Sequence, residues 1–362
     1  MSVDLSTNYG GLQLASPIVV GANPLTSREA MRLAMANAGA GALVLPSLFE
    51  DETVRWFEDL GIEFSVYDLA ASNNSSSSSV ASIEHDSALI CTDTQSYLDL
   101  IDQAASRSPI PVIASLGGTH GENWPEAACL IEQAGAQGIE LNFNWAACSL
   151  KQSGEQIEQA IIETCQRVRA STSLPLFVKL QRDYTNIVNM AEQISHCCDG
   201  LVMFGYGPEV DITLDDCKMR IHWGGGNSGS TRRSLGRILR VRAALPQLDI
   251  AANGGISEGQ AVIKSLIAGA TVTMMASALY RNGPDVIRQT LDSLRHFMSQ
   301  HQLTNLDQLR QMSPLKQEIK APPEPLPATV MPPQEGPLPG TPPGASPSSA
   351  PWCHSDRYGH VQ

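Results

Sequence analysis

The stretch "WPEAACLIEQAGAQGIELNF", residues 124–143, contains one full unit of the pattern that decides the fold. Its first part, 124–136, has apolar residues spaced three and four apart, as in an amphipathic helix. The glycine of "AGA" suits the left-handed conformation in which many helices end. The apolar run 138–143 is short enough for a buried strand. We therefore predict a helix followed closely by a strand.

The same alternation recurs from about residue 17 to residue 300. Helical spacing is also present in 27–40, 154–169 and 258–270. The candidate strands are 17–22, 42–47, 111–116, 138–143, 176–180, 200–205, 249–254 and 271–277. Eight strand–helix units match, in number and length, an α/β fold of the closed (β/α)₈ TIM-barrel type. An open, doubly wound parallel sheet is the alternative that this alternation allows.

Two segments interrupt the alternation. Residues 48–93 form a long insertion after the second strand, and the Ser-rich part of it, 70–82, has the composition of a flexible loop. Residues 314–362 are rich in Pro, Gly and Ser, as disordered tails are. We predict a barrel domain over 1–313 and a disordered tail over 314–362. The loop either flanks a site or is neutral, and the tail is either a tether or without function.

Composition argues against several classes of function. The chain has 37 acidic and 24 basic residues and a net charge of −13, so it would repel a nucleic acid. Its apolar runs are far shorter than the roughly 20 residues of a membrane span, and it begins with no signal-like segment, so we expect a cytoplasmic protein. The eight cysteines show no CxxC spacing, so we expect no metal site.

Polar residues follow or end several of the apolar strands. Chemistry in barrels of this type lies at the carboxyl ends of the strands. The residues there include Asn23, Ser47, Asn142, Lys179 and Ser277. Lys179 stands in an otherwise apolar strand, and a buried ammonium is costly without an anionic partner or ligand. We favour a cation that faces a ligand, with a salt bridge to Glu140 on the adjacent strand as the alternative.

Two glycine clusters indicate a phosphate site. "HWGGGNSG" (222–229) precedes a helix expected to start near Ser234, and "NGGISEGQ" (253–260) precedes another with Ser257 as its expected N-cap. Glycines let backbone N–H groups approach a phosphate, and a helix N-terminus favours negative charge. Together with the eighth strand, the clusters lie where many barrels hold a phosphate.

These segments, in this order, resemble a known family. "PIVVGANPLT", "AGAGALVLPSLFE", "PVIASLGG", "GIELNFN", "PLFVKL" and "NGGISEGQAVIKSLIAGA" are similar to segments of the soluble, FMN-containing class 1 dihydroorotate dehydrogenases, over roughly residues 1–312. The resemblance implies a flavoprotein oxidoreductase of pyrimidine biosynthesis that transfers hydride from a CH–CH bond of a small molecule to FMN. It also implies a homodimer or an electron-acceptor partner protein.

The resemblance further assigns contacts to FMN. Ala22, Asn23 and Ser47 would border the flavin ring, and Asn142 and Lys179 would hydrogen-bond it. The residues expected around the phosphate are Gly225, Gly226, Gly254, Gly255, Ala276 and Ser277.

The substrate side departs from the family pattern. Trp145 stands where the family has its catalytic Cys, and an indole offers no base. Ala147 replaces an Asn, Pro46 replaces a Lys, and "FGYG" (204–207) replaces an Asn-Thr pair. These departures argue against oxidation of dihydroorotate itself. The substitute bases to consider are Cys148, Asp183, Tyr184 and His120.

Two other functions fit parts of the sequence. A flavin- or phosphate-binding barrel without turnover, acting as an accessory subunit, would explain Trp145 and Pro46. A non-redox barrel acting on a phosphorylated substrate would use Lys179 as a Schiff-base nucleophile.

Overall fold

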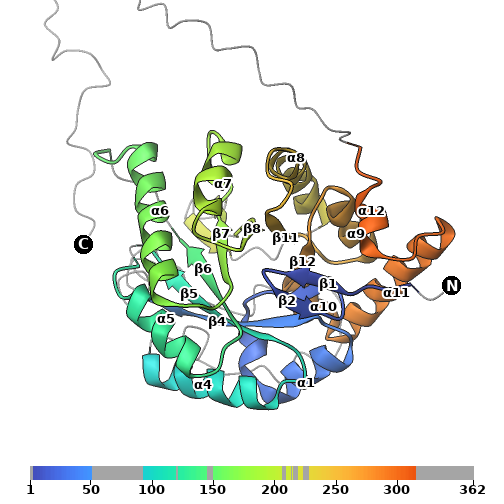
Figure 1. The fold of residues 1–362 in the computed structure, drawn as a ribbon, viewed down its shortest axis with the longest axis horizontal. Helices are drawn as coiled ribbons and strands as arrows, with labels where there is room; N and C mark the ends of the chain where they lie inside the picture. The colour runs from blue at the N-terminus through green and yellow to red at the C-terminus, as the bar shows by residue number, and fades with distance from the viewer. Residues whose placement is uncertain are drawn as a thin grey trace, which may run out of the picture. The chain divides into compact units, whose positions relative to one another are not determined.

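Eight parallel strands form a closed barrel in the computed structural model (Figure 1). The structure describes residues 3–50, 93–119, 121–144, 150–205, 209–212, 214, 219–222 and 228–314. Around the barrel the strands run β11-β12-β3-β4-β5-β6-β7-β8. They are β3 (Ile18–Val20), β4 (Ala42–Phe49), β5 (Val112–Gly118), β6 (Gly138–Phe143), β7 (Leu176–Leu180), β8 (Gly200–Met203), β11 (Asp249–Asn253) and β12 (Val272–Met275). Closure confirms the (β/α)₈ barrel and rules out the open sheet.

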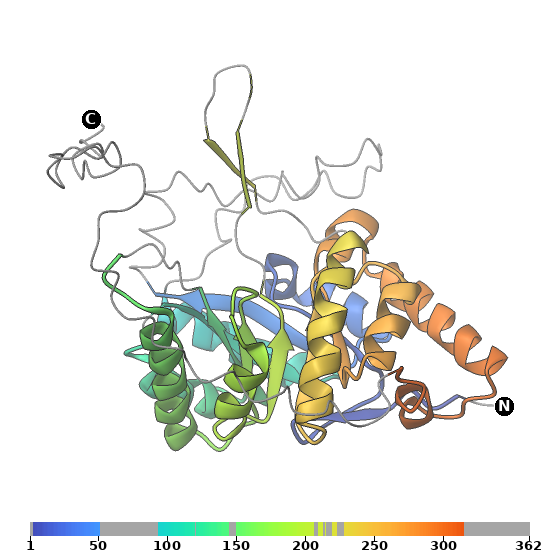
Figure 2. The ribbon, with the colours of Figure 1, turned by 90° about the horizontal axis from the view of Figure 1, so that it is seen from above.

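Helices follow the strands and lie outside them, with the green α6 on one side of the view from above and the gold and orange α8 to α11 on the other (Figure 2). They are η1 (Pro24–Ser27), α1 (Glu29–Asn37), α4 (Thr94–Arg107), α5 (Trp124–Gln133), α6 (Gly154–Ser171), α7 (Ile187–Ser195), α8 (Ser228–Ala244), α9 (Gly259–Ile267), α10 (Ser277–Asn282), α11 (Asp285–Gln300) and α12 (Leu306–Arg310). The glycines of three "AGA" ends, Gly39, Gly135 and Gly269, have positive φ, as predicted.

Two predicted helix starts were wrong. Helix α8 begins at Ser228, six residues before Ser234. The sequence did not indicate this start because the first turns of the helix are polar and carry no apolar spacing. The N-cap of α9 is Glu258 rather than Ser257, and the Glu258 side chain makes no capping hydrogen bond. Ser277 also lies outside strand β12, as the first residue of α10.

A two-stranded hairpin that sequence patterns did not reveal covers the amino end of the barrel. Strands β1 (Thr7–Tyr9) and β2 (Leu12–Leu14) pair antiparallel. The Tyr9 ring stacks on Phe177, the second residue of β7, with ring centroids 4.1 Å apart. The Gly10 N–H donates to Asp249 Oδ2 at the start of β11 (2.7 Å). A second hairpin, β9 (Glu209–Ile212) with β10 (Met219–His222), follows β8.

The inside of the barrel changes character along its axis. Its apolar part is made of Tyr9, Leu14, Val19, Ala42, Val44, Ile113, Phe177, Val202, Ala251, Val272 and Met274. Successive residues of a strand point to opposite faces, so the inward positions that follow Ile113 and Phe177 are Ser115 and Lys179. The barrel interior therefore turns from apolar to polar toward the carboxyl ends of the strands.

Most of the insertion and nearly all of the tail lie outside the described residues. This applies to the predicted Ser-rich loop 70–82 and to residues 315–362. Among the described residues, no helix combines the length and apolar character needed to cross a bilayer.

Candidate active site at the carboxyl end of the barrel

Neighbouring strands bring polar side chains together at the carboxyl end of the barrel. In the parallel ladders Ser47 lies opposite Ser115, Ser115 opposite Glu140, and Asn142 opposite Lys179. These pairs connect β4, β5, β6 and β7 in sequence around the wall. The register therefore brings residues more than a hundred positions apart into one cluster.

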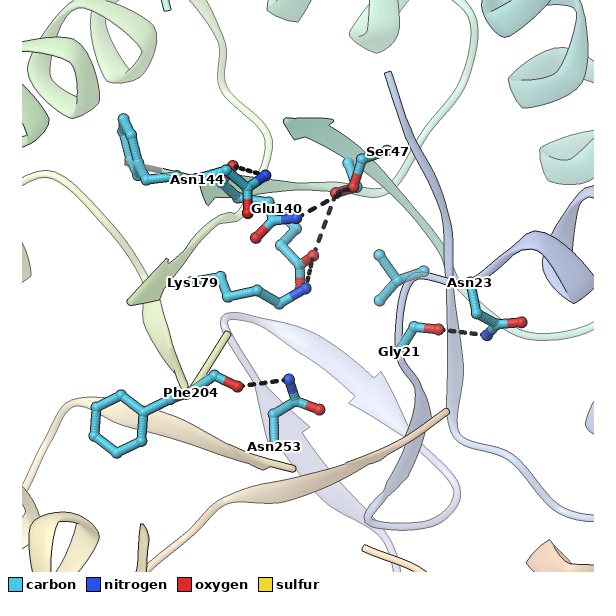
Figure 3. A network of polar contacts seen from close by, with 12 residues as sticks. Gly21, Asn23, Ser47, Glu140, Asn144, Lys179, Phe204 and Asn253 are labelled. Atoms are coloured by element: carbon cyan, nitrogen blue, oxygen red, sulfur yellow. Dashed lines mark hydrogen bonds and ion pairs between the residues drawn. The ribbon is translucent and has the colours of Figure 1, made fainter. Parts of the chain in front are cut away.

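Lys179 forms a buried ion pair with Glu140. The distance from Lys179 Nζ to Glu140 Oε1 is 2.6 Å, and the side chains are 9% and 0% exposed (Figure 3). The salt bridge between adjacent strands that was considered as the alternative is thus present, and the Lys179 side chain also extends toward the space enclosed by the strand ends (Figure 3). The Glu140 carboxylate explains how the Lys179 ammonium is tolerated in an apolar strand, because a buried charge needs a partner of opposite sign.

Two serines extend this pair into a directed hydrogen-bond chain. The Ser115 hydroxyl donates to Glu140 Oε1 (3.2 Å) and lies 2.8 Å from the Ser47 hydroxyl. Since a hydroxyl has one proton, Ser47 must donate to Ser115. The Asn142 amide in turn donates to Ser47 Oγ (3.5 Å). The chain therefore runs from Asn142 through both serines and ends on the oxygen that holds Lys179.

A tyrosine fixes Ser115 at an irregular point of the wall. The β4–β5 ladder shifts register between Val44 and Ser47, a segment that contains Pro46, which has no N–H. The Tyr97 hydroxyl, from α4, accepts from the Ser115 N–H (2.8 Å) and donates to its carbonyl (3.1 Å). A side chain thus satisfies backbone groups where the strand pairing is interrupted.

Residues at the end of β3 are engaged in the local turn. The Asn23 amide nitrogen donates to the Gly21 carbonyl (2.6 Å), and its oxygen accepts from the Leu25 N–H (2.9 Å), as the N-cap of η1. Ala22 is half-buried and packs against the barrel interior. The Asn23 side chain therefore shapes the turn, and Ala22 borders the mouth.

The second glycine cluster forms a tight turn after β11. Gly254 and Gly255 have φ of +92° and +77°, which side chains with a Cβ rarely adopt. The Gly255 carbonyl accepts from the Thr231 hydroxyl in the first turns of α8 (2.9 Å). This bond ties α8 to the turn that precedes α9.

The remaining groups near this turn come from the end of β11 and from the residues that follow β8 and β12. The Asn253 amide donates to the Phe204 carbonyl (2.8 Å), and in Figure 3 Asn253 and Lys179 extend toward the space enclosed by the strand ends. Ala276 and Ser277 are half-buried at the start of α10. Gly225 and Gly226 lie outside the described residues. The predicted phosphate contacts at Gly254, Gly255, Ala276 and Ser277 therefore share one end of the barrel with Lys179.

The structure describes two of the residues considered as substitute bases. Asp183 is exposed, and burial raises the pKa of Tyr184 well above its ordinary value, so its phenol stays protonated near neutral pH. Trp145, Ala147, Cys148 and His120 lie outside the described residues. Within the described ranges, no group of three or more His, Cys, Asp or Glu side chains could hold a metal ion.

Sequence reasoning missed Ser115, Tyr97, Thr231 and Asn253 as parts of this arrangement. Ser115 had a usable signal, because period-two alternation from Ile113 puts it on the inward face. Tyr97 had none, since its role depends on the register shift in β4.

The family described as "Dihydroorotate dehydrogenase" matches residues 91–298, more than half of the chain. Dihydroorotate dehydrogenase B (NAD(+)), catalytic subunit, of Staphylococcus carnosus is 29% identical over 207 residues, covering 55% of this chain and 67% of that protein. The protein of the same name from Thermoplasma acidophilum is 22% identical over 313 residues, covering 84% and 97%. Dihydroorotate dehydrogenase A (fumarate) of Lactobacillus helveticus is 26% identical over 179 residues, covering 48% and 58%.

Proposed function

The chain belongs to the dihydroorotate dehydrogenase family, and from this premise we propose that it is an FMN-dependent oxidoreductase with its flavin across the mouth of the barrel. The observation that carries the proposal is the buried cation Lys179 at the carboxyl end of β7, held by Glu140 among inward-facing polar residues. A buried ammonium at the carboxyl end of a barrel strand is not needed for packing, which apolar side chains achieve, and it is not needed for solubility, because it is not on the surface.

The described residues suit a flavin. A flavin ring presents hydrogen-bonding groups along its pyrimidine edge, and Lys179 and Asn142 lie opposite each other on adjacent strands as donors. The phosphate of FMN needs close backbone approach, and Gly254 and Gly255 have no side chains to obstruct it. Gly205, after β8, leaves room beside the stem of Lys179, where an added Cβ would lie 3.4 Å from Lys179 Cγ.

The roles of the chain's residues follow from their charges. Bound FMN supplies hydride acceptance. Lys179 places positive charge where negative charge develops on reduction, and such fixed charges act strongly in a water-excluded site. Asn142 and Ser47 orient the ring, and the turn at Gly254 and Gly255 binds the phosphate.

The hydride donor is proposed only as a class, a small molecule with an oxidisable CH–CH or related bond. The family's catalytic Cys position holds Trp145, and Pro46 stands in place of the family's Lys. The departures thus fall on the substrate side, while the cofactor side keeps its donors. The relatives named above as catalytic subunits support a partner protein or a second copy as the route for electrons.

The test is direct. We expect the purified chain to be yellow, to bleach with dithionite, and to lose bound flavin in Lys179→Ala while Lys264→Ala, an exchange on the outer helix α9, retains it. A folded, colourless chain that takes up no FMN in a dialysis titration would refute the proposal.

A second candidate, favoured by Trp145, is a flavin-binding accessory subunit without turnover. The two candidates differ when dihydroorotate and related cyclic amides are mixed anaerobically with the flavin-loaded chain. Bleaching by any of them supports the oxidoreductase, and retention of colour with all of them supports the accessory subunit. The Schiff-base alternative requires a neutral amine, whereas Lys179 is in a salt bridge; borohydride trapping with carbonyl compounds tests it.

A further inference from the structure

The two oxygens of Glu140 have unequal surroundings. Oε1 accepts from Lys179 Nζ (2.6 Å) and from the Ser115 hydroxyl (3.2 Å). Oε2 is buried and has no hydrogen-bond partner among the described residues. Both hydrogen bonds that the described residues give this fully buried carboxylate therefore arrive at one oxygen, and the shorter of them comes from Lys179.

The charge of Glu140 also affects Tyr9 in the barrel interior. Burial raises the pKa of the Tyr9 hydroxyl well above its ordinary value, and the Glu140 carboxylate raises it further. Tyr9 Oη is also buried and without a partner among the described residues. Glu140 lies opposite Phe177, on which Tyr9 stacks, so its charge acts through the barrel interior. The same charge also acts on a ligand beside Lys179, its ion-pair partner.

We propose that Glu140 is a positioning residue that fixes the Lys179 ammonium and reduces its positive charge at the flavin, so that it sets the reduction potential. The inference rests on the proposed function. Lys179 alone would favour reduced FMN, which is more negative than the oxidised form. A carboxylate 2.6 Å from the ammonium opposes that preference. The pair as a whole, rather than Lys179, then determines how readily the flavin is reduced.

Ser115 also affects the net charge at Lys179. Loss of its hydroxyl should change the reduction potential in the direction opposite to loss of the Glu140 carboxylate. Its hydroxyl donates to Oε1 and withdraws some of the negative charge from Lys179. Removing that donor leaves the charge of Glu140 undiminished and more strongly directed at the ammonium. The two residues therefore give variants with opposite expected signs.

The experiment uses the full chain loaded with FMN. The variants are Glu140→Gln, which removes the charge with little change of shape, Ser115→Ala, and the control Glu126→Gln, which removes an exposed acid on α5. The measurements are the midpoint potential by dye equilibration and the dissociation constant of oxidised FMN by fluorescence. A thermal melt checks that each variant folds.

In Glu140→Gln, reduced FMN should bind more tightly relative to oxidised FMN by about tenfold or more, the scale of one unit charge acting over a few ångströms at an effective dielectric constant of about 20. A tenfold change corresponds to a rise of about 30 mV in the midpoint potential. Ser115→Ala should lower the potential by a smaller amount. Glu126→Gln should match the wild type.

An unchanged or lowered potential in folded, flavin-bound Glu140→Gln would overturn the inference and leave the proposed function intact. If that variant does not fold, Ser115→Ala decides, because an unchanged or raised potential there contradicts the tuning. A folded wild type that binds no FMN would overturn both. Acetylation of Lys179 in the flavin-free chain tests the positioning independently of flavin binding. Labelling should be faster in Glu140→Gln than in Glu126→Gln, and equal rates would contradict the positioning.

Discussion

Breaking the ion pair between Lys179 and Glu140 should destabilise the barrel more than removing both of its charges. Lys179→Met removes the cation and leaves a fully buried carboxylate without its partner. At 2.6 Å the attraction is about 6 kcal/mol for an effective dielectric constant of about 20. Because Lys179 is 9% exposed, water can replace part of it, and we expect a loss of about 3 kcal/mol, the low end for a broken buried pair.

The double variant Lys179→Met, Glu140→Gln should recover much of that loss, because no unpaired charge remains. The assay is urea unfolding of the flavin-free chain, with stability read from the midpoint at constant slope. The matched control is Arg288 with Asp285, an exposed pair on α11 at 3.3 Å, whose coupling should stay below about 1 kcal/mol. If the effects of the two buried exchanges add within about 0.5 kcal/mol, the residues are not coupled and the reasoning fails.

Three further predictions concern stability. Burial raises the pKa of Tyr9 and of Tyr184, so their phenols ionise more readily in the unfolded chain. The free energy of unfolding should therefore fall as pH rises above about 10, by roughly 1.4 kcal/mol per pH unit for each tyrosine. Urea titrations should show a shallower decline in the Tyr→Phe variants. Ser153→Ala should cost about 1 kcal/mol in thermal or urea melts by removing the capping box of α6, and Ser153→Thr should not. Gly10→Ala should cost more than 1 kcal/mol, because φ is +56° and the new Cβ would lie 2.6 Å from the Phe177 ring; equal stability would show that the hairpin can shift.

The barrel strands were predictable because each is a short apolar run and all but the first follow a helix. Each of the eight predicted runs overlaps an observed strand, with ends that differ by a few residues. The β1–β2 hairpin was not predictable, because strands of three residues carry no periodic signal. The start of α8 was missed for a related reason, since "SGSTRRS" is polar on every face.

The candidate site was predictable in its members more than in its contacts. Lys179 and Glu140 attracted notice as charges in apolar strands, and both lie in the wall of the barrel. The pairing of the Lys179 ammonium with Glu140 Oε1 depends on the register of the strands, and no local sequence pattern predicts that register. Asn23 illustrates the limit, because its amide makes local hydrogen bonds as the N-cap of η1, which its position at a strand end does not reveal.

The N-terminal hairpin has a consequence for the order in which the chain can acquire its structure during synthesis. Its turn bonds to Asp249, 239 residues later, and Thr7 accepts from Arg310, 303 residues later. At 5 to 20 residues per second a ribosome needs on the order of ten to fifty seconds to reach the first of these partners. The hairpin is thus synthesised long before the residues that hold it, and the barrel cannot close until β12 has been made.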